Sequence, residues 1–204
     1  MVIEGNSVGP PTAGRDPDDR SPAPGDLRVV QALVNTLSGH TGADLIGIPA
    51  DAASWLAAAG LRPAGSAVTS SEQRALVELR ESIRAVLATH THGANKPDAA
   101  DRLTMALMHC RLMVSADPAG TVRLTSADQH PFARAVGAIA IAIAEASATG
   151  TWARLKSCPG NRCGWAFYDR SPGGRSQWCS MQVCGARAKM RAYRSRVRGG
   201  PDSG

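Results

Sequence analysis

Aromatic residues and long apolar runs are scarce in this chain of 204 residues, which holds only 4 Trp, 2 Tyr and 2 Phe. Its longest apolar run, residues 135–144, is shorter than the roughly 20 residues that a membrane-spanning helix needs. The N-terminus also lacks the basic, apolar and small-residue order of a secretory signal. These absences favour a cytoplasmic protein with no membrane partner.

Sequence motifs of several large enzyme classes are missing as well. The chain has no P-loop, no dinucleotide-binding fingerprint and no His-Glu-x-x-His pair. Its 43% hydrophobic and 20% charged residues exclude a fibrous or wholly disordered protein. We expect a globular protein that is not an enzyme.

Acidic residues are nearly absent from the last quarter of the chain. Residues 151–204 carry 11 Lys and Arg against 2 Asp and Glu, whereas residues 1–150 carry 12 against 15. Six of the eight aromatic residues and four of the five cysteines also lie in this last quarter. Such concentrated positive charge is typical of a surface that binds a polyanion, most often nucleic acid. The chain therefore divides into two parts.

The first part combines a disordered leader, residues 1–25, with a helical domain, residues 26–150. The leader has no apolar periodicity, whereas the domain repeats apolar residues at helical spacing. Asp51 is expected to cap one helix, and Ser70 with Gln73 to form a capping box at the start of another. Around residues 112–125 the pattern leaves two alternatives, a β-hairpin or the last turn of the helix that starts at residue 97. The expected helices cover residues 27–38, 51–60, 70–90, 97 onward and 131–148.

The second part contains two pairs of cysteines. Four residues separate Cys158 from Cys163, fifteen follow before Cys179, and four more precede Cys184. Four thiolates at this spacing suit one tetrahedral, structural Zn²⁺ ion. Two disulfides or an iron–sulfur cluster are the alternatives, and the lack of a secretory signal disfavours disulfides. A metal also explains how a segment of this size folds around a small core.

Residues 151–198 are expected to form a treble-clef-like zinc module, and residues 199–204 a disordered tail. Residues 165–168 are predicted to form a strand, residues 169–174 a turn and residues 176–178 a return strand. A helix that includes Cys184 then runs to about residue 198. The fold class is therefore mainly α, with a helical domain followed by a β-hairpin and a C-terminal helix that hold zinc.

The C-terminal helix has two neighbouring stripes at 100° per residue. The apolar stripe is expected to pack on the zinc hairpin, and it consists of Ala186, Met190, Tyr193 and Val197. The basic stripe suits phosphate oxygens or guanine edges, and it consists of Arg187, Arg191, Arg194 and Arg198. Lys189 on the opposite side, with Arg170 and Arg175 in the hairpin, adds to the expected nucleic-acid surface. DNA is the favoured partner, and RNA is the alternative.

These cysteines and their neighbours resemble the CGNR zinc finger family. The resemblance rests on Cys163-Gly-Trp-Ala-Phe-Tyr-Asp169-Arg-Ser171, Arg175-Ser-Gln-Trp-Cys-Ser-Met181 and Cys184-Gly-Ala-Arg187-Ala-Lys189. The helical domain is similar to the ABATE domain that usually precedes this finger. That similarity rests on Val34-Asn-Thr36, Asp44-Leu-Ile46, Trp55-Leu56 and Leu79-Arg-Glu-Ser-Ile-Arg84.

The resemblance implies that all four C-terminal cysteines bind one zinc ion in a DNA-binding, stress-induced transcription regulator. The family motif has Asn where this chain has Ala186, a position expected to face the hairpin. Family position also marks Asn35, Asp44 and Arg80 as polar residues that line a small-molecule pocket.

Three functional hypotheses remain from the sequence. In the first, the zinc module binds DNA, and the helical domain senses a small-molecule effector or forms a homodimer. In the second, the polyanion is RNA. In the third, the helical domain is an enzyme or ligand-binding scaffold and the zinc is purely structural. The first is the interpretation that the sequence favours.

Overall fold

The computed structural model describes residues 22–93 and 97–198. The expected tail and nearly all of the expected leader therefore lie outside the described residues. The last residues of that leader are ordered, because Ala23 is 3% exposed and its N–H donates to Gln31 Oε1 at 2.7 Å. The described structure thus extends before the predicted domain boundary at residue 26.

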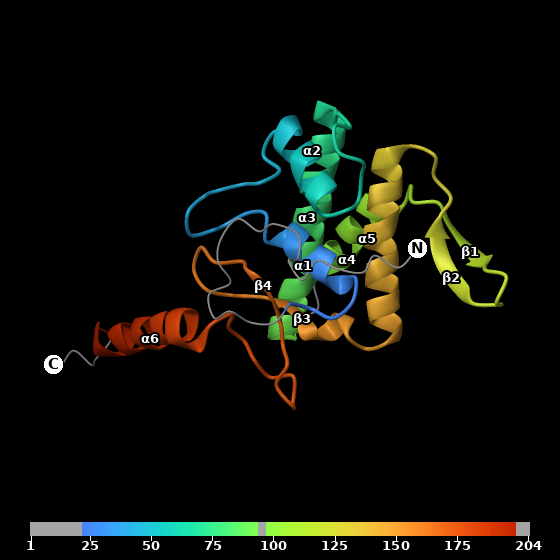
Figure 1. The fold of residues 1–204 in the computed structure, drawn as a ribbon. Coiled ribbons are helices and arrows are strands. Elements are labelled where there is room, and N and C mark those ends of the chain that lie inside the picture. The colour runs from blue at the N-terminus through green and yellow to red at the C-terminus, as the bar shows by residue number, and fades with distance from the viewer. Residues whose placement is uncertain (1–21, 94–96, 199–204) are drawn as a thin grey trace.

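The predicted mainly helical fold is confirmed (Figure 1). The helices are α1 (Leu27–Val34), α2 (Pro49–Ala58), α3 (Ser70–His92), α4 (Pro97–Leu107), α5 (Pro131–Ala148) and α6 (Ala186–Arg198). The strands are β1 (Leu112–Ala116), β2 (Val122–Ser126), β3 (Leu155–Ser157) and β4 (Ala166–Tyr168). A 3-10 turn η1 (Trp152–Arg154) precedes β3, and a π-helical turn η2 (Met181–Gly185) leads into α6.

Helices α1, α2, α3 and α5 enclose the hydrophobic core, to which β3 and β4 also contribute. The predicted stripe of α3 is fully buried: Leu76, Leu79, Ile83 and Leu87 are each at most 1% exposed. Their spacing at i, i+3, i+7 and i+11 places them on one helical face. That face lies against α1 and α2, so α3 is the central helix.

The N-cap of α3 lies one residue earlier than predicted. Thr69 is the cap: its Oγ1 accepts from Glu72 N at 3.2 Å, and Glu72 Oε2 accepts from Thr69 N at 2.7 Å. Gln73, predicted to complete a capping box with Ser70, donates instead to Ile46 O at 2.8 Å. The capping role predicted for Asp51 was also wrong, since α2 begins at Pro49 and Asp51 lies within its first turn.

Helix α5 is the one described helix that is long and apolar enough to cross a bilayer. Its buried residues include Ala135, Ile139 and Ala142, and it packs on α1 and β2. A Cβ at Gly137 would lie 2.8 Å from Ser126 Oγ, so the glycine lets β2 approach. These contacts are those of a core helix.

The two hairpins differ in how well the sequence predicted them. The antiparallel β1–β2 hairpin, with Val114 opposite Leu124, is one of the two alternatives that the sequence left open at residues 112–125. In the zinc module, β4 matches the predicted strand, but its partner is β3, with Lys156 opposite Phe167. The predicted return strand at residues 176–178 was wrong, because its backbone turns inward to hydrogen-bond Lys156 and Asp169.

The zinc module is continuous with the helical domain. Strand β3 packs on α3 and β4 packs on α1, and Leu155, Ala166 and Tyr168 belong to the main hydrophobic core. The expected boundary at residue 150 is therefore not a break in packing. Helix α6 extends away from the body of the molecule (Figure 1).

Candidate metal centre and basic helix

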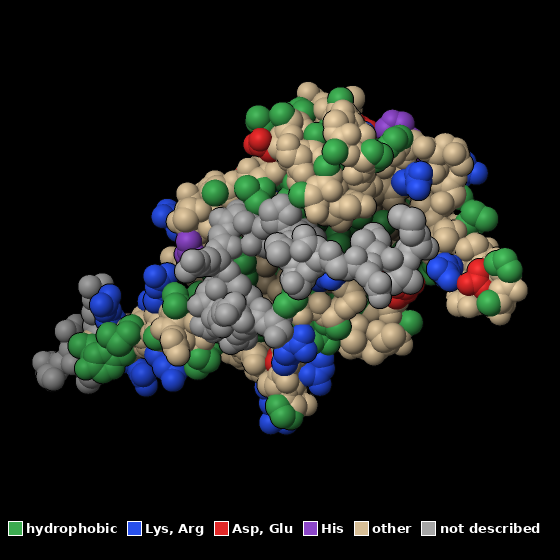
Figure 2. Space-filling view, in the orientation of Figure 1, with side chains coloured by type: hydrophobic (Ala, Val, Ile, Leu, Met, Phe, Trp, Pro, Cys, Tyr) green, Lys and Arg blue, Asp and Glu red, His purple; other side chains and the backbone are tan. Residues whose placement is uncertain are grey.

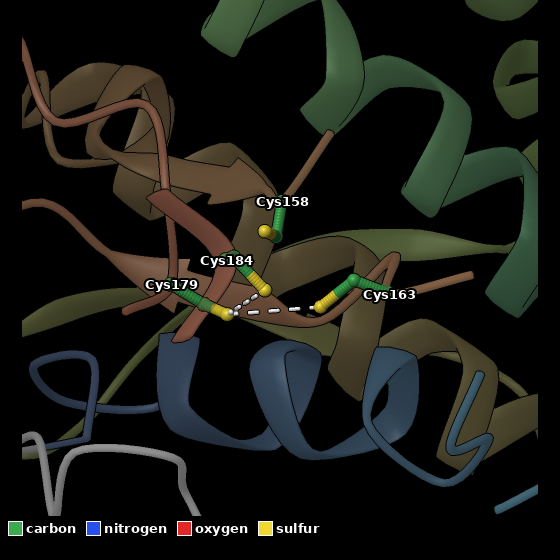
Figure 3. A group of neighbouring side chains, drawn as sticks. All are labelled: Cys158, Cys163, Cys179 and Cys184. Carbon is green, nitrogen blue, oxygen red and sulfur yellow. Dashed lines mark hydrogen bonds between the residues drawn. The ribbon is translucent and has the colours of Figure 1, made fainter. Parts of the chain in front are cut away.

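The four C-terminal cysteines converge on one point (Figure 3). Their sulfur atoms lie within 4.8 Å of one another, and all four residues are buried. The Sγ atom of Cys179 is 3.6 Å from that of Cys163 and 3.7 Å from that of Cys184. Tetrahedral Zn–S bonds of about 2.3 Å place sulfur atoms about 3.8 Å apart, so the cluster has the size of a zinc site.

This geometry excludes the disulfides that the sequence left open as an alternative. The sulfur separations are far longer than the roughly 2.05 Å of a disulfide, and all five cysteines are free. Four thiolates form a closed ligand set with no position for a substrate. The chain therefore holds a single structural zinc ion at Cys158, Cys163, Cys179 and Cys184.

The first cysteine pair lies on a tight knuckle between β3 and β4. Cys158 N donates to Trp165 O at 2.9 Å, and Cys163 N donates to Gly160 O at 2.8 Å. A Cβ at Gly160 would come within 3.1 Å of Cys184 Sγ, so only glycine leaves room for the sulfur atoms. The hairpin of the zinc site is therefore β3–β4, and the knuckle that carries Cys158 and Cys163 is its turn.

The second pair is held by the start of η2. Ser180 caps this turn, with its Oγ accepting from Val183 N at 3.1 Å and its carbonyl accepting from Cys184 N at 3.0 Å. Cys184 therefore lies in η2, two residues before α6 begins, whereas the sequence predicted it inside the first turns of the C-terminal helix. The zinc site therefore fixes the base of α6.

The electrostatics of the cluster call for a cation. Hydrogen bonds from Cys163 and Cys179 lower the pKa of Cys158. The resulting thiolate raises the pKa of Cys163 and Cys179 through the same hydrogen bonds. Four thiols so close together cannot all ionise unless a positive ion balances the charge of the thiolates, and Zn²⁺ supplies that charge.

A buried ion pair supports the loop between the two cysteine pairs. Lys156 Nζ donates to Asp169 Oδ2 at 2.9 Å, and both side chains are at most 6% exposed. Asp169 also accepts from Ser171 N at 2.9 Å and Ser176 N at 2.8 Å. Burial raises the pKa of Asp169, but these hydrogen bonds outweigh it and the pKa is lowered. We missed this pair in the sequence, although Asp169 is the lone acidic residue among the described residues of the module.

Two polar side chains of α1 and its C-cap join the helical domain to β4. Asn35 Oδ1 accepts from Ala166 N at 2.7 Å, and its Nδ2 donates to Ala166 O at 3.0 Å. Gln31 Nε2 donates to the same carbonyl at 3.3 Å. Asn35 is 2% exposed, so it completes the edge of β4 as a neighbouring strand would.

Helix α3 also forms side-chain hydrogen bonds to the zinc module. Arg84 donates to Gly164 O beside the knuckle and to Val34 O at the end of α1. Burial lowers the pKa of Arg84. The Thr91 hydroxyl donates to Ser157 O at 2.8 Å. These long-range contacts have no local sequence signal.

The three residues predicted to line a ligand pocket are engaged within the protein. Arg80 is 3% exposed, and its Nη1 donates to Asp44 Oδ1 at 2.6 Å and to Thr36 Oγ1 at 3.2 Å. Asn35 holds β4. These contacts favour a structural role for all three, and a small-molecule site at them stays a prediction.

The apolar stripe of α6 does not pack on the hairpin, contrary to expectation. Met190, Tyr193 and Val197 are 51%, 58% and 64% exposed, and Ala186 is also exposed. Helix α6 contacts chiefly η2, its own N-terminal extension. The reason is the different hairpin: the loop at residues 169–178 folds back onto Lys156 and leaves the apolar stripe of α6 uncovered.

The residues predicted to contact nucleic acid lie in two groups. Arg187, Lys189, Arg191 and Arg194 are exposed on α6, and among the described residues none of them forms an ion pair within 4 Å. Arg198 ends α6, and its side chain lies outside the description. Arg175 is exposed on the loop, whereas Arg170 stacks on Tyr168 at 5.3 Å and donates to Pro22 O at 2.8 Å. Figure 2 shows Lys and Arg side chains gathered around α6 and this loop.

Comparison with known families gives two matches in sequence order. The family model of the CGNR zinc finger matches residues 154–197. The ABATE family model, described as "Putative stress-induced transcription regulator", matches residues 27–150. No curated protein matches the chain. Both resemblances noted from the sequence are thus confirmed.

Proposed function

Since this chain belongs to the ABATE family and ends in a CGNR zinc finger, we propose that it is a transcription regulator that binds DNA through α6. The observation that carries the proposal is a projecting helix with exposed arginines and no acidic residue. In this proposal the protein is cytoplasmic and has no catalytic activity.

Electrostatics favours a polyanion as the partner of α6. Positive charges on one helix repel each other, and in the described residues no carboxylate lies close enough to neutralise them. Phosphates relieve that repulsion and release condensed counterions. The free helix therefore carries an electrostatic cost that nucleic-acid binding removes.

The geometry of α6 suits the major groove of duplex DNA. The groove is about 12 Å wide and admits one α-helix, and α6 is 13 residues long, with η2 as its chief neighbour. Arg187, Arg191 and Arg194 line the same open groove of about 530 Å³ as Ala186 and Met190. Guanidinium groups reach phosphates or guanine edges, while neighbouring apolar groups contact thymine methyls.

The zinc ion has a positioning role in this mechanism. Cys184 lies in the turn that continues directly into α6, and Asn35 and Arg84 anchor the opposite side of the knuckle to the helical domain. The orientation of α6 therefore depends on both the metal and the core. A change in the helical domain, such as binding of a small-molecule effector, would reach α6 through these bonds.

The first test is selection of the zinc-loaded full-length chain against a random duplex DNA library with an RNA pool as competitor. We expect an enriched DNA motif, and the Arg187→Glu/Arg191→Glu/Arg194→Glu variant should lose binding to it. The matched control is Arg74→Glu/Arg102→Glu/Arg134→Glu, which changes the charge equally at exposed positions of the helical domain and should retain binding. Equal enrichment of RNA would favour the RNA-binding alternative. Equal binding by both variants would remove α6 from the proposal.

A further inference from the structure

The β1–β2 hairpin has an apolar surface that the fold leaves uncovered. Met113, Val114 and Val122 are 48%, 66% and 64% exposed, and Leu112 is 39% exposed. A two-stranded sheet is marginally stable on its own. Helix α5 packs on β2, and the hairpin lies at the end of the molecule opposite α6 (Figure 1). Strand β1 is thus the outer strand.

The outer edge of β1 presents backbone groups that pair with no other strand in the described ranges. Asp117 N donates to Thr121 O at 3.0 Å, and Ala127 N donates to Arg111 O at 2.8 Å. In an antiparallel ladder hydrogen-bonded pairs alternate with non-bonded ones. The N–H and C=O groups of the intervening residues therefore point away from β2, and these residues are Leu112, Val114 and Ala116.

We propose that β1 pairs antiparallel with β1 of a second copy of this chain, about a twofold axis at Val114, and forms a four-stranded sheet across a homodimer. In this register Val114 faces the partner's Val114, and Leu112 faces the partner's Ala116. All three outward-facing residues then exchange hydrogen bonds with the second copy. The three apolar side chains of each strand also form one continuous surface.

Charge selects this register and this partner. The same twofold axis places Arg111 opposite the partner's Asp117, in a non-hydrogen-bonded pair where side chains lie closest. Arg111 is exposed, and Asp117 already attracts Arg123 at 3.0 Å on the same face. The twofold axis repeats this opposite-charge pair at both ends of β1. A strand that complements itself in backbone, apolar surface and charge fits a second copy.

The register can be tested with two proline variants of the zinc-loaded full-length chain. Val114→Pro removes an outward N–H on the β1 edge without touching the β1–β2 ladder. Val122→Pro is the matched control, because it is equally exposed, starts β2 and removes an N–H on the opposite edge. Edge positions and strand starts tolerate proline, and circular dichroism checks that both variants fold.

Sedimentation velocity over a concentration series measures the dimer dissociation constant. We expect a dimer for the unmodified chain and for Val122→Pro. Val114→Pro should raise the dissociation constant by about 30-fold or more, because the twofold axis removes two hydrogen bonds at once. Arg111→Glu, which leaves the backbone unchanged, should also weaken the dimer and reverse its salt dependence. A monomeric unmodified chain, or equal association of the two proline variants, would overturn the proposal.

Discussion

At the residue scale, Asn35 is the side chain that most directly couples the helical domain to the zinc module. It forms two hydrogen bonds with Ala166, next to Trp165, which packs among the zinc cysteines. Removal of both bonds leaves buried backbone groups of β4 without that partner. The free energy of unfolding therefore depends strongly on Asn35, although this residue lies far from the zinc cysteines in the sequence.

Asn35→Ala should lower the free energy of unfolding by about 3 kcal/mol, since two buried hydrogen bonds are lost. Urea unfolding of the zinc-loaded chain measures the change. Asn35→Asp keeps the acceptor for Ala166 N but turns a buried carboxylate toward Ala166 O, so it should cost at least as much as Asn35→Ala. Equal stability of Asn35→Ala and the unmodified chain would show that the bond pair adds nothing.

His90 makes stability depend on pH near neutrality. Burial and the nearby charge of Lys156 lower the pKa of His90, and the hydrogen bond to Leu155 O at 2.8 Å offsets part of this effect. Its ring also meets Trp152 edge-on, with centroids 5.3 Å apart. A pKa lowered by folding means that the unfolded chain takes up the proton first as pH falls.

The free energy of unfolding should therefore decrease as pH falls below about 6.5, by no more than about 1.4 kcal/mol per pH unit. His90→Gln should flatten that part of the profile, because glutamine does not titrate. Urea unfolding of both proteins at several pH values measures the difference, and every pH is high enough that the cysteines keep their zinc. A parallel decrease in both proteins would assign the pH dependence to another group.

At the element scale, α6 differs from every other helix in having no core face. Sequence periodicity alone marks its apolar stripe for burial in the same way as the stripe of α3, yet only the latter is buried. The difference comes from the tertiary structure around it. Residues 169–178 hydrogen-bond to Lys156 and Asp169 and do not cover the apolar stripe of α6.

Met190→Ala should change the free energy of unfolding by less than about 0.5 kcal/mol, as expected for an exposed site. Leu79→Ala on α3, at 1% exposure, should cost about 3 kcal/mol because it leaves a cavity. Thermal or urea unfolding of both variants makes the comparison. A cost near that of Leu79→Ala for Met190→Ala would mean that the stripe is buried after all.

The sequence predicted those elements whose signals are local. The apolar spacing of α3 and the spacing of the four cysteines each predicted the observed structure. It did not predict the partner of β4, because β3 is only three residues long and its pairing depends on Asn35 and α3. Likewise, the Lys156–Asp169 pair joins residues whose match appears only once the knuckle closes.

At the scale of the whole molecule, metal, core and α6 are one connected structure. The strands that carry the zinc knuckle contribute Leu155, Ala166 and Tyr168 to the main core. Loss of the metal should therefore destabilise the helical domain as well as the finger. This connection also gives the helical domain a physical route to the orientation of α6.

Chelation of zinc should lower the melting temperature of the entire chain, in place of a separate low-temperature transition for the finger. Cys184→Ala should have a similar effect, because three thiolates bind the metal less well. Cys110→Ala is the control, since Cys110 lies outside the cluster and its loss should leave zinc content unchanged. Calorimetry with metal analysis tests this, and an unaltered main transition after chelation would contradict it.

The central claim, that α6 is a zinc-positioned surface for nucleic acid, is tested most directly by DNA affinity as a function of salt. Fluorescence anisotropy of the selected duplex gives the logarithm of the binding constant against the logarithm of salt concentration. For the unmodified chain we predict a steep negative slope, which the Arg187→Ala/Arg191→Ala/Arg194→Ala variant should reduce by about 3. An unchanged slope and affinity in that variant would contradict the account.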